Sequence, residues 1–336
     1  MSDDIGTENT MRGRADTSGI RFRILLELDR LVLTAVLVLT VFVAFVVAVT
    51  VLAPTFATTV RSGDVIDTLF STMITVIVTG STLVVSIGQL VISQEDGPVG
   101  DQRQRMSDTL DFLAFTDELI GGTTPADPSA FLGSIVDLTA ERTRTLRDRL
   151  LDNSDEQVRT EAEEFTDSVI ENATEVSEQL DGASFGTFDV LSAALNFNYS
   201  WKLHQVDRIS TDHAAALDET DQERLQELKT ALSMFGPARE HIKTLYFQWE
   251  LITFSQRTLY TAVPALIVAS VTMATVDPVT IAGRTVGVAN LTLVVGAAFA
   301  FTLTPFLLFV AYLLRILTVA KRTLAIGPLI LRESQR

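Results

Sequence analysis

The chain contains no cysteine and only three histidines among its 336 residues. The absence of cysteine excludes disulfide bonds, thiolate metal sites and cysteine nucleophiles. The histidines, at positions 204, 213 and 241, do not form an HExxH or other metal-ligand spacing. No GxSxG elbow, P-loop or GxGxxG turn after a strand occurs either. The sequence therefore predicts a protein that is not an enzyme and that uses no metal or cofactor.

Lysine is scarce as well, because only four of the 26 basic residues are lysines, against 42 Asp and Glu. This composition resembles that of halophilic archaeal proteins, in which molar salt screens the excess carboxylates. Residues 94–256 hold 32 Asp and Glu against 13 Lys and Arg, whereas the rest of the chain holds 10 against 13. So acidic a region is unsuited to nucleic-acid backbones. Its carboxylates are predicted to serve solubility.

Long apolar runs, by contrast, are present. They cover residues 31–53, 66–92, 259–276 and 291–316, lengths that suit the hydrocarbon layer of a bilayer. Pro305 predicts a kink in the fourth run. The two short connections between runs offer only Arg61 and Arg284, and the other basic residues near the runs lie on the opposite side. By the positive-inside rule, both termini and the middle region are cytoplasmic. Arg30 and Arg315 fit anchors that snorkel to water.

The sequence thus predicts an all-α, polytopic protein of the cell membrane, with an acidic helical cytoplasmic domain inserted between the second and third of four membrane helices. Its parts are a disordered tail (1–19), two membrane helices (20–93), the domain (94–256), two more membrane helices (257–320) and a cytoplasmic tail (321–336). Within the domain, helices are expected over 129–151, 185–206, 220–234 and 237–254, with breaks at Gly121-Gly122 and Gly236-Pro237. The clearest helical period comprises Val158, Ala162, Phe165, Val169, Val176 and Leu180.

The second apolar run carries a polar stripe with steps of four and three residues. We call this set the polar face; it comprises Thr68, Thr72, Thr75, Thr79, Thr82, Ser86, Gln89 and Ser93. A mean step of 3.5 residues draws one seam along an α-helix, the seam that a left-handed supercoil keeps toward its partners. One side of this membrane helix is therefore unsuited to lipid.

Two roles are open for the polar face. In a homo-oligomer it can line a water-filled path, because weak and repeated oxygen ligands suit the passage of inorganic ions. Alternatively its hydroxyls bond to their own backbone and let helices pack closely. Both ends of the polar face carry carboxylates. Asp64 and Asp67 lie at the predicted outer end, and Glu95 and Asp96 lie at the predicted cytoplasmic end. Rings of such groups in an oligomer favour cations.

A break is expected directly after the polar face, at Gly97, Pro98 and Gly100. Proline has no amide donor and disfavours helical geometry in the residue before it, while glycine relaxes the backbone. The segment is either a plain interfacial loop or a hinge that transmits movement of the cytoplasmic domain to the polar helix.

The layout of two spans, a helical cytoplasmic block and two further spans resembles that of bestrophin-type channels, whose second membrane helix lines an oligomeric pore. The chain shows no sequence hallmark of that family, and bestrophins favour anions, so the resemblance concerns architecture and leaves selectivity open. The leading interpretation is an oligomeric ion channel or pore controlled by the cytoplasmic domain. The alternative is a membrane-anchored scaffold or signal-relay protein without conduction. A secondary transporter would require two similar halves or a charged midplane site, and the sequence has neither.

Overall fold

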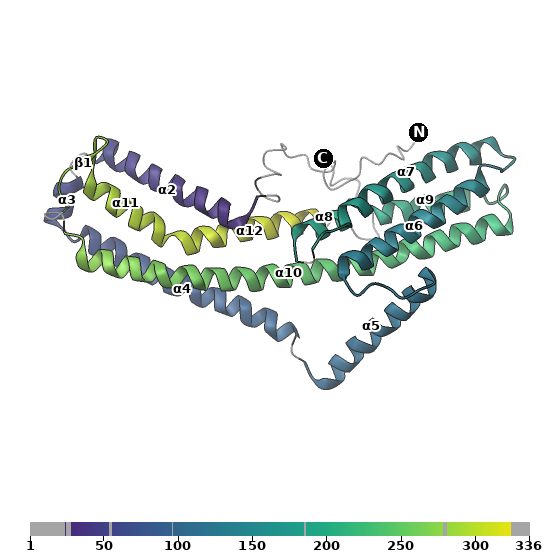
Figure 1. The fold of residues 1–336 in the computed structure, drawn as a ribbon, viewed down its shortest axis with the longest axis horizontal. Coiled ribbons are helices and arrows are strands. Elements are labelled where there is room, and N and C mark those ends of the chain that lie inside the picture. Colours follow the sequence, from purple (N-terminus) through teal and green to yellow (C-terminus); the bar gives the residue numbers. More distant parts are fainter. Residues whose placement is uncertain are drawn as a thin grey trace. The chain divides into compact units, whose positions relative to one another are not determined.

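The computed structural model describes residues 24, 28–53, 56–95, 97–184, 186–277 and 281–323, and these are mostly helical (Figure 1). The predicted tail 1–19, most of the predicted tail 321–336, and Asp96 lie outside the described residues. The chain divides into two compact units. One is formed by residues 97–247, and the other by residues 20–96 together with residues 248–318. The sequence had suggested boundaries at 94 and 256.

Unit 97–247 is a bundle of helices. Its elements are α5 (Val99–Ile120), α6 (Pro128–Leu150), α7 (Glu156–Leu180), α8 (Phe188–Asn196), α9 (Tyr199–Asp212) and the first part of α10 (Glu219–Thr275). Asp127 and Asp155 cap α6 and α7, because the side chain of each accepts hydrogen bonds from two backbone amides of the first turn. All six apolar positions predicted for residues 158–180 are buried in the core. The amphipathic period therefore directs α7 into the bundle.

The second unit contains the apolar helices. They are α2 (Arg30–Leu52), α3 (Phe56–Ser62), α4 (Val65–Glu95), the last part of α10, α11 (Asn290–Thr302) and α12 (Thr304–Thr323). Among the described residues, α2, α4 and α10 are long and apolar enough to cross a membrane. The helices α11 and α12 form a fourth span if they are counted together, since they meet at a bend of 45°. The bend lies beside Pro305, where the sequence predicts a kink.

Packing within this second unit depends on close contacts at small residues. A Cβ atom at Gly296 of α11 would lie 2.9 Å from the ring of Phe45 on α2, so only glycine fits there. Phe45 also packs on Phe299, with ring centroids 5.3 Å apart. Phe70 of α4 is fully buried in a cluster with Ala269 of α10 and residues of α11. Such close approach of backbones is typical of helix packing in membranes.

Two predictions about helix boundaries are wrong: one predicted break is absent, and one break was not predicted. The predicted helices 220–234 and 237–254 and the third apolar run are all parts of the single 57-residue helix α10, which does not break at Gly236-Pro237. Buried side chains on both sides of the glycine, among them Phe235 and Ala238, hold the helix in place, because tertiary packing overrides local propensity. Conversely, the predicted helix 185–206 is two helices, α8 and α9, and the Asn198 side chain caps the second of them.

A short hairpin, like the short helix α3, is an element that the sequence did not predict. Strands β1 (Arg284–Thr285) and β2 (Val288–Ala289) pair antiparallel just before α11. The two turn residues, Val286 and Gly287, have φ angles of 53° and 81°. Positive φ at both central positions is what a two-residue hairpin turn of type I′ requires.

The polar face of α4 as candidate functional site

The polar face lies entirely on the continuous helix α4, and all eight of its side chains are exposed on the surface of the protomer. The residues two positions earlier face the other way: Ile66, Phe70, Met73, Ile77, Val84 and Val91 are buried, and Gly80 and Ile87 are half-buried. A step of two residues turns an α-helix by about 200°. The polar face is thus diametrically opposite the side of α4 that packs within the unit, and it points away from the protomer.

The buried side of α4 packs on α10, α11 and α12. Ile77 contacts Ala262 and Ala265 in one small cluster. Nearer the end of α4, Gly88 faces Ser255 of α10, whose Oγ would lie 3.7 Å from a Cβ atom at that glycine. Small residues on both helices let their backbones approach closely. The orientation of the polar face is therefore determined by the packing of α4 against its own protomer.

The hydroxyl groups of the polar face mostly donate their hydrogens to the helix itself. Thr72 donates to the carbonyl of Thr68 at 2.7 Å, Thr82 to that of Val78 at 3.0 Å, and Ser86 to that of Thr82 at 3.1 Å. Thr75 and Ser93 also donate to carbonyls of their own helix. The donors of these five hydroxyl groups are satisfied in this way, and their oxygen lone pairs remain available to an outside partner.

Gln89 differs from the five hydroxyl-bearing residues that bond to their own helix. Its side-chain amide is exposed and makes no hydrogen bond with any residue that the structure describes. Gln104 and Gln179 bond to carboxylates four residues away on their own helices, but Gln89 has no carboxylate at that spacing. Transfer of its side-chain amide to hydrocarbon without a partner costs on the order of several kcal/mol. The position therefore requires water or a polar group of another molecule.

The structure describes the carboxylates at one end of the polar face but not those at the other end. Asp64 and Asp67 are exposed, and the Asp64 carbonyl accepts the amide of Thr68 at 2.9 Å, which places Asp64 at the N-cap of α4. Asp67 lies in the first helical turn, where the helix dipole stabilises a negative charge. Glu95 is the last residue of α4, but its side chain, like the whole of Asp96, is outside the described part of the chain.

The break predicted after the polar face is present. Helix α4 ends at Glu95 and α5 begins at Val99, with Pro98 as its N-cap. Neither Gly97 nor Gly100 has a positive φ angle, and a Cβ atom at Gly100 would meet nothing within 4 Å. The interruption is therefore explained by Pro98, which lacks an amide hydrogen and disfavours helical geometry at Gly97. It coincides with the boundary between the two units.

Sequence reasoning missed a set of polar side chains that joins α10 to α12. Arg257 donates a hydrogen bond to the Tyr312 hydroxyl at 2.8 Å, and Glu250 lies 3.6 Å from the guanidinium of Arg315. Arg30 is only 3% exposed. Arg30 is thus enclosed by the protein, contrary to the expectation that it snorkels to water, whereas Arg315 is half-buried beside Glu250. Only the spacing of Glu250 and Arg257, seven residues apart on one helix face, hinted at this contact.

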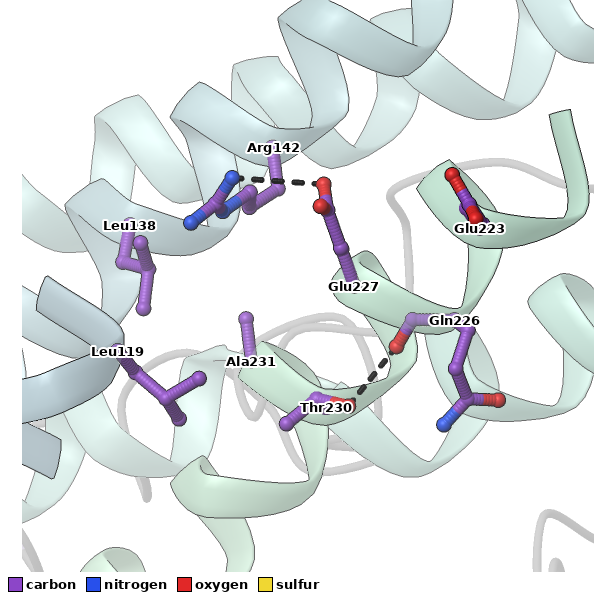
Figure 2. A pocket seen from close by; sticks show the side chains of 8 residues that line it. All are labelled: Leu119, Leu138, Arg142, Glu223, Gln226, Glu227, Thr230 and Ala231. Atoms are coloured by element: carbon purple, nitrogen blue, oxygen red, sulfur yellow. Dashed lines mark hydrogen bonds and ion pairs between the residues drawn. The ribbon is translucent and has the colours of Figure 1, made fainter. Parts of the chain in front are cut away.

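Unit 97–247 holds a shallow pocket of about 300 Å³ between α5, α6 and α10 (Figure 2). Leu119, Leu138 and Ala231 form its apolar side, and the ion pair between Arg142 and Glu227, at 3.4 Å, crosses its rim. No group of three His, Asp or Glu side chains comes together as metal ligands within the described ranges. The pocket brings together none of the predicted site residues, and the polar face remains the better candidate.

Comparison with known proteins identifies a family without assigning an activity. No curated protein and no solved structure matches the chain. The model of a family of unknown function, DUF7972, matches residues 1–336. Because this match covers the whole chain, the protein belongs to the family DUF7972.

Proposed function

We propose that this protein is an oligomeric ion channel or pore whose path is lined by the polar face of α4, with a preference for cations and with gating through unit 97–247. The observation that carries the proposal is the outward orientation of all eight polar side chains, opposite the side of α4 that packs within the protomer. Symmetric copies of such a helix around an axis would enclose a hydrophilic path.

The exposed amide of Gln89 supports assembly over a lipid-facing monomer. A face formed only by serine and threonine is tolerated in lipid, because the hydroxyls bond to their own backbone. Gln89 has no such partner among the described residues. Assembly around an axis would give this amide water or the same residue of neighbouring copies, which removes the cost of an unpaired polar group in hydrocarbon.

Two features support the preference for cations. The hydroxyls that donate to their own helix would present lone pairs to the path, and oxygen acceptors coordinate cations. The exposed carboxylates of Asp64 and Asp67 would form rings at one mouth of a symmetric assembly and would raise the local cation concentration.

Two connections between the units support the proposal that unit 97–247 gates the path along α4. The first is the interruption at Pro98, which directly follows the polar helix. The second is α10, which contributes to both units without a break and packs on the buried side of α4. A continuous helix can carry a displacement from one unit to the other, and a proline-containing break lets the two helices that it joins change direction relative to each other.

The competing function is a membrane-anchored scaffold or signal-relay protein without conduction. The same backbone-directed hydrogen bonds favour it, because threonine and serine in this state are common at dry helix interfaces. The two functions differ in whether the polar face contacts water.

Single cysteines test this difference, since the chain has none of its own. We expect Thr75→Cys, Thr82→Cys and Ser86→Cys to react with a small aqueous thiol reagent and to change the current across a planar bilayer. Leu39→Cys, on the exposed side of α2, is the matched lipid-facing control and should not react. If the α4 cysteines stay unlabelled while Asp152→Cys, at an exposed turn, reacts readily, the polar face is dry and the scaffold is supported.

A further inference from the structure

Helix α5 carries an apolar stripe that its own protomer leaves uncovered. All residues from 99 to 111 are exposed, and among them Val99, Met106 and Leu110 are 81%, 62% and 57% exposed. Only the last turns of α5 attach to the unit, through residues such as Phe112 and Leu119. Figure 1 shows the helix standing apart from the other helices of its unit. Large apolar side chains in such a row mark an interaction surface.

The stripe has the spacing of a helix-association seam. Val99, Arg103, Met106, Leu110 and Leu113 follow one another in steps of four and three residues, the period that keeps a seam toward a partner helix in a left-handed supercoil. Beside this seam lies a row of small residues at seven-residue intervals, Gly100, Ser107 and Ala114. Small neighbours let a partner helix approach closely.

We propose that this stripe is a self-association surface on which α5 packs against α5 of a second copy of the chain. The inference rests on the oligomer of the proposed function. Val99 follows the last residue of α4 by four positions, so the stripe begins within about 14 Å of the end of α4. Copies gathered around an axis by their α4 helices therefore bring their α5 helices together as well.

The charge of α5 favours a second copy over the membrane surface. The exposed residues 99–111 contain Asp101, Asp108 and Asp111 against only Arg103 and Arg105. Helices that lie on a bilayer carry a basic polar face, which anionic lipids attract. The acidic surplus here opposes that attraction, whereas it is solvated on the outer side of a helix pair.

Arg103 is the one charged residue among the first four positions of the seam. A single polar side chain at a seam position lowers the stability of a coiled coil but restricts its register and number of strands. The guanidinium has a long apolar stem, which packs along the stripe while the charge reaches water. The seam is therefore expected to select one arrangement of helices rather than to aggregate.

Cysteine cross-linking in native membranes tests the surface. We expect mild oxidation to convert Met106→Cys and Leu110→Cys into covalent dimers of the 36.7 kDa chain. Asp108→Cys is the matched control, since it is also exposed and lies about 200° around the helix from position 106. We expect it to form at least about tenfold less dimer. Equal cross-linking at positions 106 and 108, or none at 106 and 110, overturns the proposal.

A fluorophore attached to the thiol of the Met106→Cys variant distinguishes a helix partner from the membrane surface, the other candidate occupant of the stripe. Quenching by nitroxide lipids would place α5 on the membrane and would overturn the proposal, whereas shielding from water without such quenching supports a helix partner. The proposed function is judged independently in the same preparations. If Thr82→Cys reacts with the aqueous reagent and the assembly stays oligomeric while position 106 fails to cross-link, only the α5 surface is wrong. If the chain is monomeric, both the α5 surface and the proposed function are wrong.

Discussion

At the scale of single residues, Gly236 shows how packing changes the meaning of a sequence signal. Glycine followed by proline ordinarily marks the end of a helix, yet α10 continues through both residues. A Cβ atom at position 236 would lie 3.0 Å from the hydroxyl and ring of Tyr199. The glycine therefore serves the close contact between α9 and α10, and the tertiary contact outweighs its low helix propensity.

We predict that Gly236→Ala destabilises the protein by about 1–3 kcal/mol, the usual cost of overpacking a filled site. Gly133→Ala, in α6, is the matched control because a Cβ atom there meets nothing within 4 Å, and it should stabilise by up to about 1 kcal/mol through better helix propensity. Thermal unfolding in mild detergent, followed by circular dichroism, measures both. Recovery of stability in the double variant Gly236→Ala/Tyr199→Ala, compared with Tyr199→Ala alone, would confirm the clash, and equal losses from the two glycine variants would contradict it.

At the scale of elements, the start of α10 depends on paired carboxylates. The Asp221 amide donates to the Asp218 side chain at 2.8 Å, and the Asp218 amide donates to the Asp221 side chain at 3.0 Å. Arg149 of α6 contacts both carboxylates. The backbone hydrogen bond from Asp221, together with the charge of Arg149, lowers the pKa of Asp218. This reciprocal arrangement satisfies amides that the first turn of a helix leaves unpaired.

The lowered pKa predicts a loss of stability in acid. A carboxylate whose pKa is lower in the folded state stabilises the fold above its ordinary pKa, and this contribution disappears as the pH falls through the folded value. We therefore expect Asp218→Asn to lower the melting temperature at pH 7 and to differ less from the wild type below about pH 4. Glu223→Gln removes a carboxylate near the same end of α10 that makes no hydrogen bond with a described residue, and is the control. A difference between Asp218→Asn and wild type that stays constant with pH would exclude this linkage.

At the scale of the whole molecule, the outward polar face and the uncovered stripe of α5 both indicate assembly. Neither surface has a partner within the described part of the protomer. One polar stripe cannot enclose a path by itself, so conduction along α4 requires several copies around an axis.

We predict that the protein–detergent complex, once its detergent is subtracted, has a mass that is a multiple of 36.7 kDa. Light scattering or native mass spectrometry in mild detergent measures this mass. The double variant Thr82→Leu/Gln89→Leu should dissociate at a lower detergent concentration, because it replaces polar groups that copies would share. If the wild-type protein is monomeric under the mildest conditions, the proposed pore is excluded.

Local periodicity made much of the fold predictable. The apolar face of α7 and the apolar runs of α2 and α4 appear in the sequence because each depends on the spacing of neighbouring residues along one helix. The break at Pro98 was predictable for the same reason, since proline acts on the backbone beside it. The continuity of α10 and the contact of Glu250 with Arg315 were not predictable. Both are decided by partners far away in the chain.

The sequence by itself determined that α4 has a polar face, since the helical repeat of 3.6 residues places all eight side chains in one stripe. Only the tertiary structure decided that this stripe points out of the protomer. A helical period states which residues share a side but not what covers that side. The choice is made by residues of α10, α11 and α12, which cover the large apolar side chains of α4 and leave its hydroxyl-bearing side to the exterior.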